Sequence, residues 1–283
     1  MQILYNSLIE SSISIRIFFW GLPLFYIFTE TTPMKSEGLS EKELRTFGEQ
    51  IRLSGIGQAG QLKIKESRIL VIGAGGKGTS AMRCLVGAGV GFIGISDNYV
   101  VEQPSLTRQN LYGENALGRQ KAIISKQKLS EYSSFTNFEI HNICISEQNI
   151  MPIVALYELI LDATDNFPAH YLINDAAVKC SKPVVFGSVV HNTSLVTVLN
   201  HAGGPSLRCL YPVPPKNKGE YTDNGITAIN LLYGITGTLM ANEAIKIVLG
   251  AESVLNGKLM KFTMGDYAVS FTPIKRNPDN FVH

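Results

Sequence analysis

Short apolar runs alternate with helix-like segments along most of the chain. The apolar runs lie at residues 68–72, 92–96, 158–161 and 183–186, and a further strand is predicted near residues 138–141. Their lack of polar alternation is typical of strands that are buried on both faces of a parallel sheet. Helices are predicted between them, at residues 40–53, 79–85, 119–129 and 168–179. This alternation of strand and helix predicts a fold of the α/β class.

The pattern changes after Ser188. Residues 194–199 are expected to form an antiparallel strand, residues 226–249 a long apolar helix, and residues 258–262 and 267–273 the closing strands. Residues 57–65 are interpreted as a connecting stretch, and the polar, proline-rich residues 212–224 as a mobile loop. The predicted fold is therefore a Rossmann-like, mostly parallel sheet with helices on both faces and an antiparallel C-terminal extension.

Residues 1–33 differ from the rest of the chain. Their apolar run at residues 15–28 contains Arg16 and is shorter than the roughly 20 residues that a transmembrane helix needs. The basic residues and the small-residue cleavage site of a signal peptide are not found around it. We expect translation to begin at Met34, residues 1–33 to be extraneous, and residues 34–283 to form one domain.

Composition narrows the classes of function. Apolar residues make up 45% of the chain and charged residues 17%, which excludes a disordered protein. The net charge is +2, so no basic surplus indicates a nucleic-acid partner. The four cysteines form no C-x-x-C pair, which favours reduced thiols. We expect a cytoplasmic protein with no membrane partner.

A glycine-rich turn joins the first apolar run to a predicted helix. Gly73, Gly75 and Gly78 form a G-x-G-x-x-G pattern, in which glycine allows a sharp turn and a close approach to phosphate. The N-terminus of the following helix presents unpaired N–H groups to an anion. Asp97 ends the next strand, where a carboxylate can accept hydrogen bonds from ribose hydroxyls. The pattern predicts nucleotide binding but does not separate NAD from ATP.

Charged residues near the predicted carboxyl ends of the strands favour ATP. Arg108 and Lys121 could stabilise a triphosphate, whose leaving group needs cations. Asp165 follows a buried strand, where it could hold Mg²⁺ beside the phosphates. The competing interpretations are surface salt bridges for Arg108 and Lys121, and a helix N-cap for Asp165.

Several short motifs lie in a fixed order along the chain. They are residues 68–78 (RILVIGAGGKG), 88–91 (AGVG), Asp97, 107–109 (TRQ), 118–121 (GRQK), 162–166 (DATDN) and 242–246 (NEAIK). In order and spacing, the stretch from about Leu39 to Pro278 resembles the MoeB/ThiF/HesA adenylyltransferases, relatives of the ubiquitin-activating enzymes.

The resemblance implies an ATP- and Mg²⁺-dependent adenylyltransferase, of the molybdopterin or thiamine biosynthesis type. Its partner would be a small ubiquitin-like sulfur-carrier protein, whose C-terminal Gly-Gly carboxylate attacks the α-phosphate of ATP to give an acyl-adenylate and pyrophosphate. The implied catalytic residues are Arg108, Lys121 and Asp165, with Asp165 as the Mg²⁺ ligand. The implied nucleotide-binding residues are Gly73, Gly75, Gly76, Asp97, Ser105, Arg108, Gln109, Lys121, Asp165 and Asn166. The resemblance also implies a homodimer.

The chain departs from the family pattern near the nucleotide. Tyr99 stands where the family has a second Asp, and Ser105 where it has an Asn. In the family an Arg from the partner subunit reaches the ATP. Glu49 stands at that position, and Arg45 and Arg52 lie one turn to either side and could substitute for it.

The metal and sulfur chemistry of the family also looks incomplete. Of its two zinc-binding C-x-x-C pairs only Cys209 remains, and the second pair would fall at Asn280 and His283, so we predict no zinc site. Residues 221–225 lack the cysteine that some members use for sulfur transfer, which favours an enzyme that stops at the adenylate. Two alternatives stay open: a catalytically impaired nucleotide-binding scaffold of the same fold, and an NAD-dependent oxidoreductase.

Overall fold

The computed structural model describes residues 13–15, 29–31, 38–213 and 229–281. The chain divides into two compact units, Met1–Gly38 and Leu39–His283. In the first unit, strands β1 (Ile13–Ile15) and β2 (Thr29–Thr31) pair antiparallel. A start of translation at Met34 stays a prediction, and most of the loop expected at residues 212–224 lies outside the described residues.

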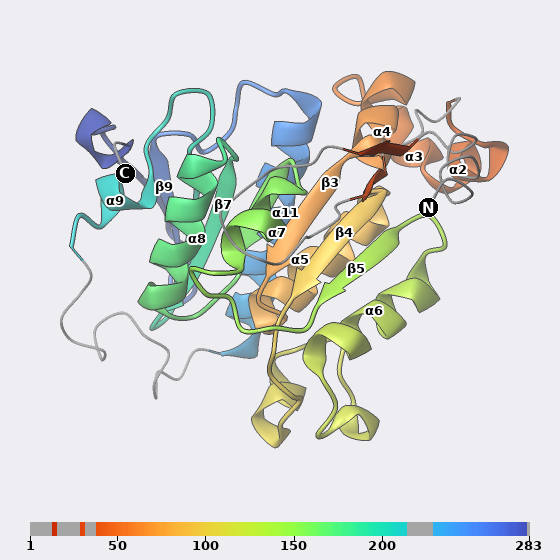
Figure 1. Ribbon diagram of the computed structural model, residues 1–283, viewed down its shortest axis with the longest axis horizontal. Coiled ribbons are helices and arrows are strands. Elements are labelled where there is room, and N and C mark those ends of the chain that lie inside the picture. The colour runs from red at the N-terminus through yellow and green to blue at the C-terminus, as the bar shows by residue number, and fades with distance from the viewer. Residues whose placement is uncertain (1–12, 16–28, 32–37, 214–228, 282–283) are drawn as a thin grey trace, which may run out of the picture. The chain divides into compact units, whose positions relative to one another are not determined.

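The second unit is built on an eight-stranded sheet (Figure 1). Its strands are β3 (Arg68–Ile72), β4 (Phe92–Ser96), β5 (Asn137–His141), β6 (Leu159–Asp162), β7 (Val184–Val190), β8 (Thr193–Leu199), β9 (Lys258–Thr263) and β10 (Val269–Pro273). They follow the order β10-β9-β8-β7-β6-β3-β4-β5. Strands β5, β4, β3, β6 and β7 run parallel, and β8, β9 and β10 are added antiparallel. The predicted mostly parallel sheet with an antiparallel C-terminal extension is confirmed.

Helices cover both faces of the sheet, as predicted. Helices α5 (Gly76–Ala88) and α11 (Asn230–Leu249) pack on one face, and α7 (Ile150–Ala155) and α8 (Phe167–Lys179) on the other (Figure 1). The remaining helices are α2 (Glu41–Thr46), α3 (Gly48–Ile51), α4 (Gly57–Glu66), α6 (Lys121–Tyr132) and α9 (Leu207–Leu210), with the 3-10 turns η1 (Gln103–Thr107), η2 (Glu114–Ala116) and η3 (Pro278–Phe281).

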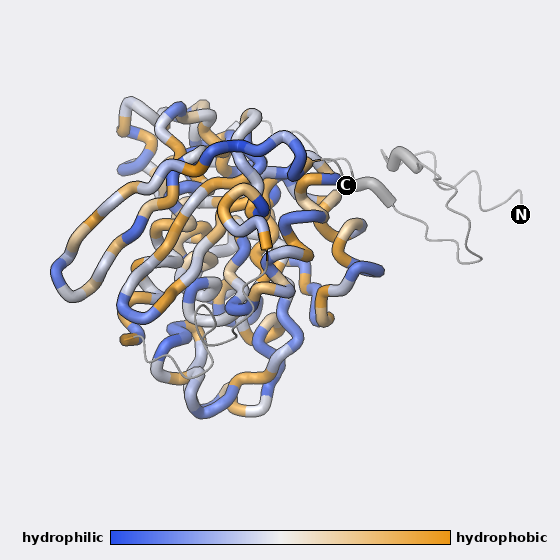
Figure 2. The backbone as a smooth tube through the Cα atoms, turned by 90° about the vertical axis from the view of Figure 1, so that its left-hand side faces the viewer, coloured by the Kyte–Doolittle hydropathy of each residue, from blue (hydrophilic) through white to orange (hydrophobic). Residues whose placement is uncertain are grey.

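Strand β3 forms an uninterrupted apolar run because helices cover both faces of the sheet. Ile69 and Val71 point into the core beneath α5 and α11, whereas Leu70 and Ile72 point into the core beneath α7 and α8. Burying each such side chain contributes roughly 1.5–3 kcal/mol. Figure 2 shows polar residues at the tips of several loops.

Two expectations about helices are wrong, and one short helix is not predicted. Residues 57–65 form most of α4 rather than a connecting stretch, because Gln61 is buried there and donates a hydrogen bond to the carbonyl oxygen of Ala88. The helix expected at residues 40–53 is divided between α2 and α3 at Phe47, whose buried ring packs against Phe135. The short helix α7 was absent from the prediction, because a segment of one or two turns gives little periodicity.

Helix α11 comes into close contact with α5 at Gly237. A Cβ atom on Gly237 would overlap the carbonyl oxygen of Lys77, whereas one on Gly234 would meet only Ser80 Oγ, at 4.0 Å. We expect Gly237→Ala to lower the free energy of unfolding by about 1–3 kcal/mol, the usual cost of overpacking. Gly234→Ala is the matched control and should leave stability unchanged or raise it by up to about 1 kcal/mol. Urea unfolding measures both, and equal effects would contradict the close contact.

Candidate functional site

Three of the predicted site residues follow neighbouring parallel strands. Gly73 follows β3, Asp97 follows β4, and Asp165 comes shortly after β6. Strand β3 lies between β4 and β6, so the direction in which strands are added reverses there. In open α/β sheets, ligands bind in the crevice outside the carboxyl ends of the strands at such a point. The topology therefore brings these residues together at the carboxyl ends of the parallel strands.

The glycines of the turn have different structural roles. Gly73 has a φ of +98°, and a Cβ atom on it would lie 2.8 Å from a backbone carbonyl oxygen, so only glycine fits there. A Cβ atom on Gly76 would lie 2.8 Å from the carbonyl oxygen of Arg108. On Gly75 the nearest atom would be Asp165 Oδ2, at 3.8 Å. Gly75 therefore has the most open surroundings of the three, whereas Gly73 and Gly76 lie against neighbouring backbone. Contacts of these glycines with a phosphate stay predictions.

Asp97 holds the glycine turn from the end of β4. Its Oδ2 accepts a hydrogen bond from Ala74 N at 2.7 Å, and its Oδ1 accepts one from Tyr99 N at 2.8 Å. Burial raises the pKa of the Asp97 carboxyl, while these hydrogen bonds and the nearby Lys121 oppose the rise. Each carboxylate oxygen can accept a further hydrogen bond. The predicted ribose contact is therefore compatible with the structural role of Asp97.

Arg108 and Lys121 contribute positive charge on the side of the site where Asp97 lies. The exposed guanidinium of Arg108 lies 5.7 Å from the centroid of the Tyr233 ring. Lys121 begins α6, and its ammonium lies 5.9 Å from the centroid of the Tyr99 ring and interacts electrostatically with Asp97. Within the described part of the chain neither residue forms a salt bridge, so the surface salt-bridge interpretation is not supported.

Ser105 and Gln109 are both buried near Arg108, at 3% exposure each. The Ser105 Oγ accepts a hydrogen bond from Glu102 N at 3.3 Å and so closes the turn η1. Gln109 Oε1 is buried and finds no hydrogen-bond partner among the residues that the structure describes. Such an oxygen is costly to leave unsatisfied, and the role of Gln109 in nucleotide binding stays a prediction. Ser105 is instead engaged with its own backbone.

The loop after β6 presents Asp165 to the glycine turn. Asn166 caps α8, since its Oδ1 accepts a hydrogen bond from Ala169 N at 2.9 Å. The N-cap interpretation of Asp165 is therefore wrong. The Asp165 side chain is 44% exposed, which leaves the carboxylate accessible to a metal ion.

Lys77, between Gly76 and Gly78, belongs to the site but is not identified by the motifs. Its side chain is 2% exposed, and its ammonium lies 2.7 Å from Asp165 Oδ1. It also donates a hydrogen bond to the carbonyl oxygen of Thr164 at 2.8 Å. The signal in the sequence is a charged residue inside a glycine-rich turn, because a charge buried there must be paired.

A buried polar network lies behind the Asp165 loop. Asp162 Oδ2 lies 2.7 Å from its hydrogen-bond partner His170 Nδ1, and Asp162 Oδ1 accepts hydrogen bonds from Thr164 Oγ1 at 2.7 Å and Thr164 N at 3.1 Å. Burial acts to raise the pKa of Asp162, but His170 and Thr164 outweigh it and hold this pKa below its usual value. The network fixes the backbone of Thr164, whose carbonyl oxygen binds Lys77.

Residues that stand at the family's zinc-ligand positions lie close together around Cys209. Its sulfur accepts hydrogen bonds from Asn277 N at 3.3 Å, Ser206 N at 3.4 Å and Asn280 Nδ2 at 3.6 Å. Burial acts to raise the pKa of the Cys209 thiol, but these hydrogen bonds outweigh it and lower the pKa. Among the residues that the structure describes, no group of three His, Cys, Asp or Glu side chains could hold a metal ion. His283 lies outside that part of the chain.

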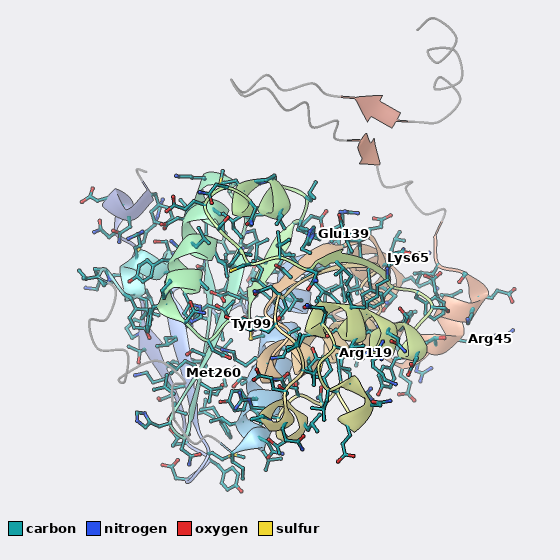
Figure 3. All side chains as sticks on the ribbon, turned by 60° about the horizontal axis from the view of Figure 1, so that its bottom comes forward. Arg45, Lys65, Tyr99, Arg119, Glu139 and Met260 are labelled. Carbon is teal, nitrogen blue, oxygen red and sulfur yellow. The ribbon has the colours of Figure 1, made fainter. Side chains whose placement is uncertain are left out.

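The arginines beside Glu49 are exposed on the N-terminal helices of the second unit. Arg45 forms an ion pair with Glu41 at 3.7 Å, and Arg52 is exposed just after α3. Figure 3 shows Arg45 at the edge of this unit, well away from Tyr99 at the site. A contact between Arg45 and a nucleotide would therefore need a second copy of the chain.

The residues gathered here fit a nucleoside triphosphate with Mg²⁺. Gly75 gives phosphate access to the start of α5, where unpaired N–H groups and the helix dipole favour an anion. The Asp165 carboxylate is the type of oxygen ligand that Mg²⁺ prefers beside phosphate.

Comparison with known proteins places the chain in a family. The model of the ThiF family matches residues 47–281. The chain belongs to the ThiF family. It is 40% identical over 226 residues to the adenylyltransferase and sulfurtransferase MOCS3 of Culex quinquefasciatus, covering 79% of this chain and 51% of that protein. It is 34% identical over 244 residues to the sulfur carrier protein adenylyltransferase of Thermus thermophilus, covering 84% of this chain and 90% of that protein. The chain thus spans about half the length of the MOCS3 relatives.

Solved structures share the fold of this ThiF-family chain. E. coli MccB with MccA-N7isoASN matches with a TM-score of 0.74 at 18% identity, covering 83% of this chain and 73% of that one. PaaA matches with a TM-score of 0.71 at 20% identity, covering 86% and 77%. These likenesses support the α/β architecture. None of the helices in the described residues has the length and apolar character needed to cross a membrane.

Proposed function

We propose that this chain is an ATP-dependent adenylyltransferase that activates the C-terminal carboxylate of a small ubiquitin-like sulfur-carrier protein. The observation that carries the proposal is the gathering of two carboxylates and two cations around the glycine turn, namely Asp97, Asp165, Lys77 and Lys121. A dinucleotide site relies mainly on backbone groups for its pyrophosphate, whereas triphosphate chemistry uses cations on the leaving group. The name of the Thermus relative, matched over 90% of its length, supports the same activity.

The proposed reaction requires little acid–base catalysis by the protein. The carrier carboxylate is already ionised at neutral pH and attacks the α-phosphorus, the bond to the bridging oxygen of the β-phosphate breaks, and pyrophosphate leaves. Catalysis then rests on positioning and charge stabilisation. Arg108 and Lys121 stabilise the charge that develops on the phosphates, and Asp97 binds the ribose while it holds the turn. Mg²⁺ on Asp165 would supply further charge neutralisation to the leaving pyrophosphate.

We also propose that the chain works as a homodimer. The exposed positions of Arg45 and Arg52 support this proposal, because either side chain is available to the site of a second copy. The carrier is proposed to belong to molybdopterin or thiamine biosynthesis. The MOCS3 relatives and the probable molybdopterin-synthase adenylyltransferase of Porphyra purpurea, 36% identical over 237 residues, favour the molybdopterin type.

Calorimetric titration of the full chain with ATP and NAD tests the proposed function. We expect MgATP to bind in preference to NAD, and Asp165→Ala to remove the difference in ATP affinity between Mg²⁺ and EDTA, because the metal loses its protein ligand. Asp175→Ala is the control, since Asp175 on α8 pairs instead with Arg208 on α9, at 2.6 Å, and both side chains are partly exposed. Preference for NAD, or no nucleotide binding, would contradict the proposal. Pyrophosphate exchange with added carrier proteins then identifies the substrate.

A further inference from the structure

Lys77 places a buried cation directly behind the candidate metal ligand. Its ammonium is held by Asp165 Oδ1 at 2.7 Å and by the carbonyl oxygen of Thr164 at 2.8 Å. Burying an ammonium costs several kcal/mol, which good partners only offset, and an apolar side chain of similar length would pack there without that cost. Packing alone therefore does not account for a lysine at this position.

The ion pair changes what Asp165 can offer to a metal. Its Oδ1 is bound to Lys77, whereas Oδ2 faces Gly75 and has no partner among the described residues. The carboxylate is thus held in one orientation, with a single oxygen directed towards the phosphate position. The positive charge of Lys77 also offsets the negative charge that would attract a divalent cation.

The local charge balance depends on Lys77. Asp97 interacts electrostatically with both Lys121 and Asp165, so Lys77, Asp165, Asp97 and Lys121 form one connected charged group. With Lys77 the four formal charges sum to zero, and without it they sum to one negative charge. A triphosphate without Mg²⁺ is strongly anionic, and its binding is therefore sensitive to the loss of this one cation.

We propose that Lys77 is a resident cation of the phosphate site, which positions Asp165 and takes over part of the charge neutralisation that Mg²⁺ supplies. This inference rests on the proposed function, in that it requires ATP to bind here. It makes Lys77 a positioning residue that acts through Asp165 and through its charge. The consequence is a site that binds ATP with a weak dependence on Mg²⁺.

Calorimetric ATP binding, measured once with Mg²⁺ and once with EDTA, tests this role. In the unmodified chain, removal of Mg²⁺ should weaken ATP binding by less than about tenfold. Lys77→Met keeps the length of the side chain and removes the charge. We expect it to weaken ATP binding in EDTA by about tenfold or more, but to weaken binding with Mg²⁺ by less than about threefold.

Two further variants separate charge from structure. The double variant Lys77→Met/Asp165→Asn replaces the ion pair by neutral groups of similar size, so it does not leave the Asp165 carboxylate without its cation. It should regain ATP affinity in EDTA to within about threefold of the unmodified chain, and Mg²⁺ should no longer change its affinity. Lys77→Gln keeps a hydrogen-bond donor without the charge and should resemble Lys77→Met. Circular dichroism checks the fold of each variant.

Three results would overturn the inference. They are an unchanged ATP affinity of Lys77→Met in EDTA, a double variant as weak as the single variant, and a Lys77→Gln variant that binds ATP as the unmodified chain does. If the unmodified chain fails to bind MgATP, the proposed function fails instead. The two failures are therefore distinguishable in one set of titrations.

Discussion

Arg108→Ala is expected to slow ATP–pyrophosphate exchange by about 10²-fold or more, as the loss of a charge contact to the transition state does. The guanidinium is exposed and lies 5.7 Å from the centroid of the Tyr233 ring, so its removal opens no cavity in the core. The carbonyl oxygen of Arg108, which lies against Gly76, is kept in the variant. The expected loss of rate is therefore caused by removal of the Arg108 side chain and not by a change in the fold.

The kinetic pattern and a matched control sharpen this test. An interaction that forms only in the transition state lowers kcat and kcat/KM together, whereas uniform binding would raise KM alone. Arg276 is another exposed arginine, which follows the edge strand β10, and its guanidinium lies 4.4 Å from the centroid of the Phe281 ring. Arg276→Ala should change the rate by less than about twofold. An unchanged rate in Arg108→Ala would remove this residue from the mechanism.

The parallel core of the fold could be predicted because its physical cause is local. A strand covered on both faces must be apolar at every position, as Ile69 to Ile72 are, and this gives a run that the sequence displays directly. Its carboxyl end is then fixed by the glycine turn, and the next strand brings Asp97 to the same edge of the sheet. These steps need only neighbouring residues and the rule that parallel strands end together.

The features that the sequence did not indicate depend on contacts between distant segments. Helix α4 contains glycines that weaken its helical pattern, and it is stabilised by the buried Gln61, which binds a carbonyl oxygen of α5. The capping of α8 by Asn166 rather than Asp165 depends on the exact residue at which the helix begins. Lys77 looks like a surface residue until the loop after β6 is folded against it. Such contacts have no signal within a short window of sequence.

The largest effect on stability is expected at Asp162, where Asp162→Ala should lower the free energy of unfolding by about 3–5 kcal/mol. Asp162 is 2% exposed, and its loss leaves His170 Nδ1 and Thr164 Oγ1 without their shared partner. Asp175→Ala is the control, because the side chains of Asp175 and Arg208 are 29% and 27% exposed. This pair is bidentate but partly exposed, so its loss should cost less than the loss of the buried network. Urea unfolding measures both variants, and a small loss in Asp162→Ala would show that the network adds little.

The Asp162 carboxylate also makes the free energy of unfolding depend on pH. Burial acts to raise the pKa of Asp162, but His170 and Thr164 outweigh it, so this pKa is lower in the folded chain than in the unfolded one. An unfolded Asp titrates at about pH 3.9, so the contribution of Asp162 is complete above that pH and is lost as the pH falls through the folded pKa. Asp162→Asn cannot titrate, and between neutral pH and about pH 3 it should lose less stability than the unmodified chain. Equal losses would assign the acid sensitivity to other carboxylates.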